Sequence, residues 1–329
     1  YDLWQFKASY AFDWADLVMI ASQSEKRLGA DYDQSSTLAA NSPASLLFTT
    51  YQGKGWPSSQ EVRLVSAAGG DWDWLAGIFH SQYEVDFFGS VTAGDDVLPP
   101  VLGNLPLPLP IFTEHGLVVG LTKYTGTVGE LAGFSEVSWR FAPDWQLTGG
   151  LRLYRFDYDL HVTFDGPICA ATDPACVASA LHSDLPLANQ ERGMSPKLSL
   201  KWDISDDLMA YATAARGFRF GGINPVSHPE IPLTYNSDSL WSYEVGTRSQ
   251  WLDKTLIGDI TAFYIDWTNA QFQTTTSDGL GFGYTDNVGA VKGRGLEGQL
   301  IWLTPVPGVK LTAIAAYADI VTAADFTKT

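Results

Sequence analysis

Apolar and polar side chains alternate with a period of two along most of this chain, and this pattern restricts the fold more than any other feature. From Trp145 to Leu153 one set of alternate positions reads Trp, Leu, Gly, Leu, Leu and the other reads Gln, Thr, Gly, Arg. Successive side chains of a β-strand point to opposite faces, so such a segment predicts a strand with one apolar and one polar face. The same split recurs at Leu198–Trp202, Trp241–Val245, Leu256–Tyr264, Leu296–Trp302 and Leu311–Tyr317. The chain is therefore predicted to be all-β.

The connections between these strands are of two kinds. Short turn sequences such as Ala142-Pro143-Asp144 alternate with long segments rich in Pro, Gly, Asp and Ser, which we expect to be loops. These long segments cover about residues 29–57, 89–123, 163–190, 220–236 and 274–284. Together the connections separate about twelve antiparallel strands, and tight turns at one end with long loops at the other are typical of an outer-membrane β-barrel with periplasmic turns and extracellular loops. A soluble β-sandwich or propeller with its aromatic residues in the core is the alternative.

No segment has the ~18 consecutive apolar residues of a membrane-spanning helix. If the chain meets a membrane, it must cross as a closed barrel, because only that structure satisfies every backbone polar group in lipid without helices. The alternating row from Leu256 to Tyr264 is about nine residues long, which is close to what a tilted strand needs to cross the hydrocarbon. We expect Asp266, the next position of that row, to mark the edge of the bilayer.

Composition and cysteine usage narrow the classes of function. Charged residues make up 17% of the chain, and the formal net charge of −17 excludes nucleic-acid binding. Cys169 and Cys176 predict a loop disulfide formed in an oxidising compartment, with free thiols or half a metal site as alternatives. The five His residues are scattered without the spacing of a metal site, so neither a metal nor another cofactor is predicted.

Five groups of short segments stand in a fixed order between Gln60 and Tyr317. They are Gln60–Leu64, Ala214–Asn224, Tyr243–Gly246 with Trp251–Asp253, Phe263–Gln271, and Asn287–Gly289 with Gly295–Glu297. In this order they resemble the barrel of TonB-dependent outer-membrane receptors. The departures are Phe220, where that family often has proline, and Gly298, where a second acidic residue is common. The resemblance implies a structural role for the motif positions Gly217, Phe218, Gly222, Tyr243, Gly246, Asn287, Gly289, Gly295 and Glu297.

The resemblance implies more than a fold. Such receptors combine a barrel of about 22 strands, within the range of outer-membrane barrels, with an N-terminal plug domain that contacts the TonB complex. Residues 1–329 are therefore expected to be a partial barrel that lacks the plug and the terminal strands. The implied function is active import of a scarce ligand, above all a ferric siderophore, across the bacterial outer membrane with TonB-derived energy. The implied partners are the TonB complex, the ligand and outer-membrane lipid.

Five charged or polar residues are candidates for ligand contact. Arg216, Arg219 and Asn224 stand at the loop end of one predicted strand, although the two arginines fall on opposite faces. Glu244 and Arg248 share a polar face that would line the lumen, where charges also serve simply to solvate a water-filled interior.

Two rival functions remain open. A passive porin-like channel shares the strand pattern but folds a loop into the lumen. An outer-membrane enzyme needs a nucleophile beside a base, and the sequence contains no Gly-x-Ser-x-Gly motif. No catalytic residue is therefore predicted.

Overall fold

The computed structural model describes residues 2–33, 47–67, 69–93, 112–113, 116–166, 182–224, 230–277 and 283–323. The strands are β1 (Asp2–Ala11), β2 (Ala15–Asp33), β3 (Leu47–Ser66), β4 (Trp72–Ala93), β5 (Phe112–Thr113), β6 (Gly116–Ala142), β7 (Trp145–Asp165), β8 (His182–Ser205), β9 (Leu208–Arg219), β10 (Gly222–Ile223), β11 (Thr234–Tyr235), β12 (Asp238–Trp251), β13 (Leu256–Thr268), β14 (Gln271–Thr275), β15 (Gly283–Asn287), β16 (Val291–Leu303) and β17 (Lys310–Thr322). Among these residues, no helix is long and apolar enough to cross a membrane.

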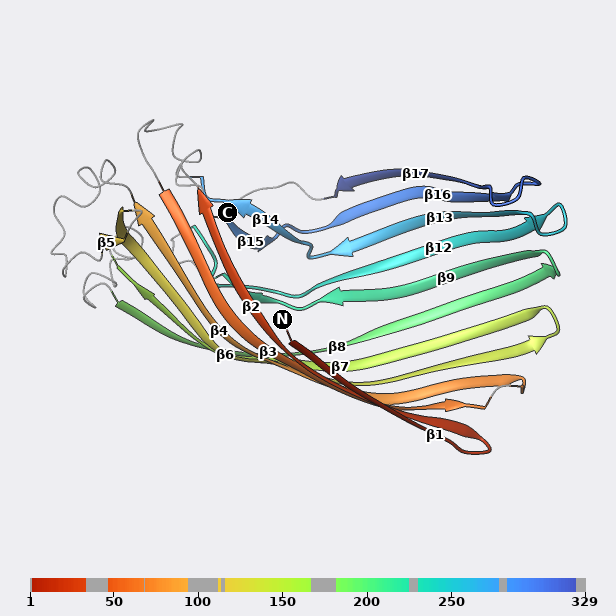
Figure 1. Ribbon diagram of the computed structural model, residues 1–329, viewed down its shortest axis with the longest axis horizontal. Helices are drawn as coiled ribbons and strands as arrows, with labels where there is room; N and C mark the ends of the chain where they lie inside the picture. Colours follow the sequence, from red (N-terminus) through yellow and green to blue (C-terminus); the bar gives the residue numbers. More distant parts are fainter. Residues whose placement is uncertain are drawn as a thin grey trace.

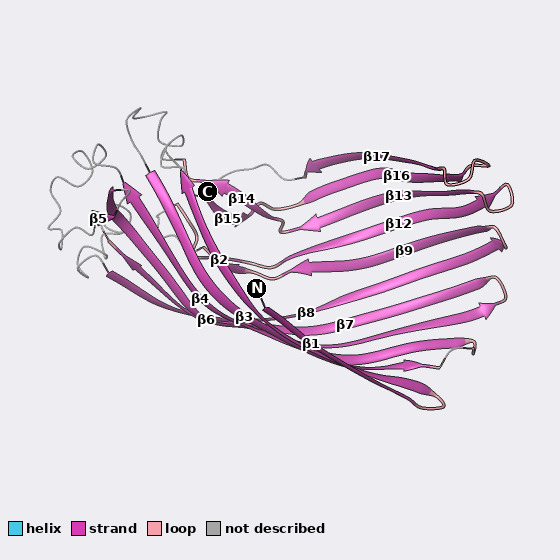
Figure 2. Ribbon diagram, in the orientation of Figure 1, coloured by secondary structure: helices cyan, strands magenta, loops and turns pink. Residues whose placement is uncertain are grey.

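One curved antiparallel sheet dominates the structure (Figures 1 and 2). It has 13 strands, which follow the order β1-β2-β3-β4-β6-β7-β8-β9-β12-β13-β16-β17 with β5 beside β6. The pairs β10–β11 and β14–β15 form two small sheets of their own. Short turns join the strands at one end of the main sheet, and the short strands β5, β14 and β15 lie at the other end (Figure 1). The prediction of an all-β fold with about twelve successive antiparallel strands is confirmed, and the sheet is open, with β1 and β17 as its edges.

The predicted loop boundaries were wrong by several residues, because the strands run further. β2 continues to Asp33 and β3 begins at Leu47, inside the loop expected at residues 29–57. Likewise β7 continues to Asp165 and β8 begins at His182, inside the loop expected at residues 163–190. Strands β6 and β7 have 27 and 21 residues. A tilted strand needs only about 9–11 residues to cross hydrocarbon, so about half of each long strand extends beyond that span.

The apolar side chains change face halfway along the long strands. We call the face of Thr148 and Arg152 the inner face, and the face of Leu151 and Leu153 the outer face. On the turn side of β7 the outer Leu151 and Leu153 are 39% and 54% exposed. On the loop side the apolar residues are inner and buried, namely Phe156, Tyr158, Leu160, Val162 and Phe164.

The change of face does not come from a bulge. The pairing of β7 with β8 runs from Trp145↔Trp202 to Asp165↔His182 without a register shift. The sequence itself changes phase between Leu153 and Tyr154, so an unbroken strand presents apolar side chains outward in one half and inward in the other.

A chain of outer-face aromatic rings lies near the short-turn ends. Trp72 stacks on Trp139 with ring centroids 5.1 Å apart, and Trp145 stacks on Trp202 at 4.9 Å. Phe141 connects these two stacks through tilted contacts with Trp139 and Trp145. The tryptophan rings, apolar in body with a polar N–H at one edge, suit the boundary between apolar and aqueous surroundings.

Candidate functional site

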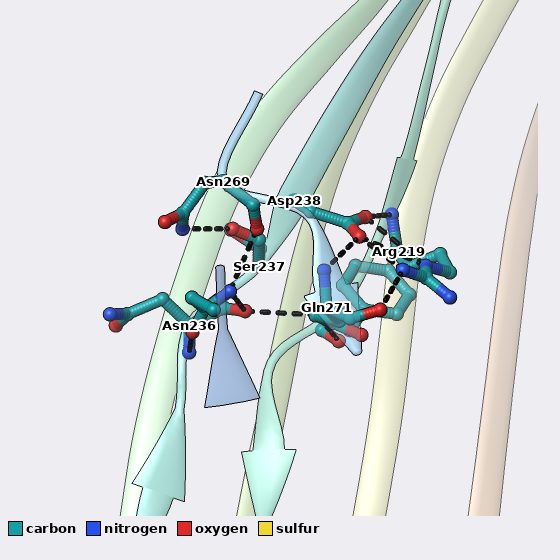
Figure 3. Close-up of polar contacts among 8 residues, drawn as sticks. Arg219, Asn236, Ser237, Asp238, Asn269 and Gln271 are labelled. Carbon is teal, nitrogen blue, oxygen red and sulfur yellow. Dashed lines mark hydrogen bonds and ion pairs between the residues drawn. The ribbon is translucent and has the colours of Figure 1, made fainter. Parts of the chain in front are cut away.

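A network of polar side chains lies at the loop end of the sheet, where β9 ends, β12 begins and β14 starts (Figure 3). Arg219 is the last residue of β9 and pairs in register with Asp238, the first residue of β12. Gln271 is the first residue of β14 and reaches the same point. Three strand ends are therefore joined around one charged pair.

Arg219 and Asp238 form a multiply bonded ion pair. The Arg219 Nε donates to Asp238 Oδ2 at 3.0 Å and to Oδ1 at 3.3 Å, and its Nη2 also donates to Oδ2. The backbone N–H groups of Arg219 and Gln271 donate to the same carboxylate at 3.2 Å and 3.0 Å. The Asp238 side chain is 2% exposed and that of Arg219 is 52% exposed. The carboxylate is thus enclosed, while the guanidinium keeps a free side that can meet a ligand.

The electrostatics of the pair follow from these bonds. Asp238 lies one residue nearer the loops than Ser239, which pairs with Thr268, and therefore nearer the loops than Asp266. It is outside the apolar rows of the turn half. Burial by itself raises the pKa of Asp238, but hydrogen bonds from Arg219, from the Gln271 N–H and from Trp267 outweigh burial and hold the pKa below its ordinary value. The Arg219 guanidinium also lies over the Trp267 ring, 4.7 Å from its centroid. The Asp238 carboxylate is therefore held in its charged form, and the bonds to it orient the Arg219 side chain.

Three asparagines complete the network around this junction. Asn287 Nδ2 donates to the carbonyls of Asn236 and Asn269 at 3.0 Å and 2.8 Å, and its Oδ1 accepts from the Asn236 N–H at 2.7 Å. Asn269 has a positive φ of 58°, which asparagine tolerates better than most residues, and its Nδ2 donates to the Ser237 carbonyl at 2.8 Å (Figure 3). The motif residue Asn287 thus ties the connection after β13 to the connection before β12.

Asn224, a predicted ligand residue, is buried and bonded to backbone. Its Nδ2 donates to the carbonyls of Pro232 and Thr285 at 2.8 Å and 2.9 Å, and its Oδ1 accepts from the Thr285 N–H at 2.8 Å. The side chain fastens the β10–β11 pair to β15, and its role in ligand contact stays a prediction.

The other predicted ligand residues lie apart from this network. Arg216 is on the opposite face from Arg219 and donates from Nη2 to Ser239 Oγ at 3.1 Å. Glu244 accepts a hydrogen bond of 3.0 Å from Ser242. Arg248 lies over the Tyr211 ring, 5.8 Å from its centroid. Their ligand roles also stay predictions.

Two further charges on the inner face have partners across strands. Lys197 Nζ donates to Glu136 Oε2 at 2.9 Å, and Arg140 bonds Asp73 and the carbonyl of Gly70. Glu136 and Arg140, which share a polar face of β6, are therefore each bonded to another part of the sheet, Glu136 to β8 across β7 and Arg140 to the start of β4 and the turn before it.

Three motif glycines lie beneath aromatic rings of the neighbouring strand. A Cβ at Gly246 would stand 2.7 Å from the Tyr211 ring, and one at Gly295 would stand 2.4 Å from the Phe263 ring. Gly222 lies under Tyr235 in the same way. The remaining motif positions are placed as follows: Gly217 has no atom within 4 Å of a built Cβ, Gly289 has a positive φ of 90°, Phe218 stacks on Tyr154, Tyr243 is exposed on the outer face, and Glu297 pairs in register with Thr261.

The sequence reading missed an aromatic wall on the inner face of the loop half. Phe87 of β4 stacks on Tyr124 of β6 with centroids 4.4 Å apart, and Tyr51 of β3 contacts Phe87 at 5.5 Å. Further along the same face, Phe220, the residue after β9, stacks on Phe156 of β7 with centroids 3.7 Å apart. The change of phase within the long strands was the sequence signal that could have revealed this wall.

The cysteine and histidine predictions have different outcomes. Cys169 and Cys176 lie outside the described residues, so their pairing stays a prediction. His80 hydrogen-bonds Gln60 at 2.9 Å and His161 contacts Asp184 at 3.0 Å, each as an isolated pair. Among the described residues, no group of three or more potential metal ligands comes together.

Solved structures with a similar fold include several outer-membrane and siderophore receptors. The ferric yersiniabactin uptake receptor FyuA from Yersinia pestis has a TM-score of 0.72 at 14% identity, over 96% of this chain and 42% of that one. The siderophore receptor PiuA from Acinetobacter baumannii has a TM-score of 0.69 at 15% identity, over 97% and 46%. The ferripyoverdine receptor of the outer membrane of Pseudomonas aeruginosa has a TM-score of 0.57 at 14% identity, over 97% and 40%. The chain thus spans less than half the length of these structures.

The family follows from a match over the whole chain. A family model described as "TonB dependent receptor-like, beta-barrel" matches residues 1–329. The five groups of motif segments in their fixed order, the antiparallel sheet and this match agree. The chain belongs to the TonB-dependent receptor-like β-barrel family.

Proposed function

We propose that the protein containing this chain is an outer-membrane receptor that actively imports a ferric siderophore, with energy from a TonB complex. Membership of the receptor family supports the transport class. The energy source, the plug that contacts TonB and the ligand are inferred from the resemblance and from the receptors that share the fold. Binding and transport require no catalytic residue in this chain.

The observation that carries the proposal is the change of face in the long strands. In the turn half the outer face is apolar, which suits lipid, and the inner face carries polar pairs such as Arg152 with Glu130. In the loop half the inner face is apolar and the outer face carries residues such as Asp86 and Lys123. A soluble protein has no reason for this exchange, whereas a strand that leaves a bilayer and continues into water requires it.

The aromatic wall is the proposed ligand surface. Tyr51, Phe87 and Tyr124 form a continuous row of rings on the inner face above the level of the proposed membrane. Siderophores that chelate iron through aromatic rings match such a wall by stacking, and the exposed side of Arg219 supplies a cation for their negative charge.

Uptake by the full-length protein tests the function. The protein is placed in an outer membrane, and accumulation of a labelled ferric chelate is followed under iron limitation, with and without inner-membrane energy. Energy-dependent accumulation supports the receptor. Energy-independent flux would favour the passive porin, and energy-dependent uptake of a different ligand would keep the receptor but replace the siderophore.

A matched pair of variants tests the wall. Phe87→Ala removes an inner ring that contacts both Tyr51 and Tyr124, and we expect a loss of affinity of roughly 3- to 10-fold, from about 0.5–1.5 kcal/mol per aromatic contact. Phe88→Ala removes the neighbouring ring, which is exposed on the outer face, and should leave affinity unchanged. Equal effects of the two changes would refute the wall as the ligand surface.

A further inference from the structure

Two arginines face each other on the outer surface where the apolar rows of β7 and β8 end. Arg155 of β7 and Arg192 of β8 are direct partners in the sheet register. The preceding outer pair is Leu153↔Met194, whose side chains are 54% and 51% exposed. Alternation places each arginine on the outer face, one step toward the loops from these apolar residues. The two cations therefore lie at the loop-side edge of the apolar outer surface.

The local charges do not neutralise this pair. Arg155 Nε lies 3.3 Å from Asp157 Oδ1, and both side chains are 48% exposed. Arg192 Nη2 donates to Gln190 Oε1 at 3.0 Å, which is a neutral acceptor. Among the residues that the structure describes, the two cations thus share one carboxylate, in a chain whose net charge is −17. Like charges directly opposite each other destabilise a sheet, so an anion bound between them would be stabilising.

An apolar groove lies on the outer face, on the short-turn side of Arg155. It has a volume of about 530 Å³, and its apolar lining includes Leu17, Val62, Leu64, Ile78, Leu151 and Leu153. Gly133 and Ala76, whose side chains are absent or small, also line the groove and leave room in it. Leu153 is the last outer residue of β7 before Arg155, so the groove and the cations are continuous along one strand.

The β9 side of this arginine pair is not covered by sheet pairing. β9 pairs with β8 only from Lys197↔Ala215 to Ser205↔Leu208. Arg192 lies on the part of β8 beyond Lys197, which has no pairing with β9, and Phe220, the residue after β9, stacks on Phe156 of β7 instead. Access to the arginines from the outer surface is therefore open on that side.

We propose that Arg155 and Arg192 bind the phosphate group of an outer-leaflet lipid, with an acyl chain of the same lipid in the groove below. Guanidinium groups bind phosphate oxygens through paired, charge-assisted N–H bonds, which a phosphate between two arginines can accept from both sides. The groove takes hydrocarbon because its lining is apolar, and basic sites beside spanning segments bind lipid head groups. This inference rests on the proposed function, since it requires the apolar outer surface to lie in a membrane.

Native mass spectrometry of the full-length protein in detergent tests the lipid site. The protein is mixed with lipid A that carries both phosphates and, separately, with the same lipid after its phosphates are removed. We expect wild-type protein to retain the phosphorylated lipid roughly tenfold better. In the variant R155Q with R192Q this preference should disappear, whereas R155K with R192K should keep part of it, since lysine retains the charge but not the paired bonds.

A second like-charged pair supplies the control. Arg27 and Lys54 are also register partners on the outer face, but they lie further toward the loops and Arg27 is already bonded to Glu25 at 2.6 Å. R27Q with K54Q should leave lipid retention unchanged. If wild-type protein retains both lipids equally, or if the control variant loses as much as R155Q with R192Q, the lipid site is overturned. The comparison of lipids on wild-type protein decides the matter even where a variant does not fold.

The two proposals fail in different ways. Protein that takes up a ferric chelate but shows no preference for phosphorylated lipid refutes only the lipid site. Protein that is not recovered in the outer membrane refutes the proposed function, and the lipid site with it.

Discussion

Removal of the Asp238 carboxylate should release the loop end of β14. The carboxylate accepts the backbone N–H groups of Arg219 and Gln271, and it is 2% exposed, so Asp238→Ala leaves two donors without an acceptor in a site closed to water. Each unsatisfied donor costs about 1–3 kcal/mol, which gives about 2–6 kcal/mol for the two donors of this junction. The Arg219 side chain is half exposed and can turn to water, so the lost ion pair adds little.

Hydrogen exchange of the full-length protein in detergent measures this effect at one amide. A local loss of about 2 kcal/mol should speed exchange of the Gln271 N–H roughly 30-fold. The control is Asp203→Ala, because Asp203 is 45% exposed and its contact with Lys201 at 2.9 Å is a surface ion pair worth about 0–1 kcal/mol. Unchanged exchange at Gln271 in Asp238→Ala would refute the role given to the carboxylate.

The reciprocal variant sharpens the same argument. Arg219→Ala leaves the buried Asp238 carboxylate without its cation, and breaking a buried pair in this way costs about 3–5 kcal/mol. We expect Arg219→Ala to destabilise the junction at least as much as Asp238→Ala. If Arg219→Ala were the milder change, the guanidinium would not be what holds the carboxylate in place.

Three further results are expected. Gly246→Val places a Cβ 2.7 Å from the ring above it and should cost about 1–3 kcal/mol of barrel stability on thermal unfolding, whereas Gly149→Val, with no atom within 4 Å, should cost much less. Ile260→Lys, at the centre of an outer apolar row, should cost about 2–4 kcal/mol in lipid, while Gln299→Lys on the inner face should be nearly neutral in the same refolding titration. The pKa of Asp238 is lower in the folded protein than its ordinary value of 3.8, so the charged carboxylate stabilises the fold. This stabilisation is complete above pH 3.8 and is lost as the pH falls through the lower, folded-state pKa. Thermal unfolding of wild-type protein should therefore show a loss of stability in acid that Asp238→Ala lacks.

The fold was predictable because its signal is local and repeated. Alternation in segments such as Trp145–Leu153 specifies a strand and its two faces without reference to any other part of the chain. Short turn sequences such as Ala142-Pro143-Asp144 join strands that are neighbours in the sequence, so the order of the sheet follows directly. The strand ends were misplaced because the phase of the alternation changes, and polar residues on the outer face of the loop half resemble loop residues.

The candidate site was only partly predictable. Arg219 could be selected as a cation at a strand end, but its partner Asp238 is 19 residues away and meets it only through the register of β9 with β12. For Asn224, residue type alone could not show the contacts that its side chain makes in the fold. Its amide suits a ligand, yet in the folded chain backbone groups of Pro232 and Thr285 occupy it.

The sequence by itself determined that the chain forms successive antiparallel strands, which face of their turn halves is apolar, and to which family the chain belongs, because each of these is encoded in a short segment or in the order of segments. Only the tertiary structure decided that Phe87 stacks on Tyr124 and that Arg155 opposes Arg192. Those contacts depend on the stagger between neighbouring strands, and a shift of one residue would turn every side chain to the other face. That stagger is set by the packing of the whole sheet.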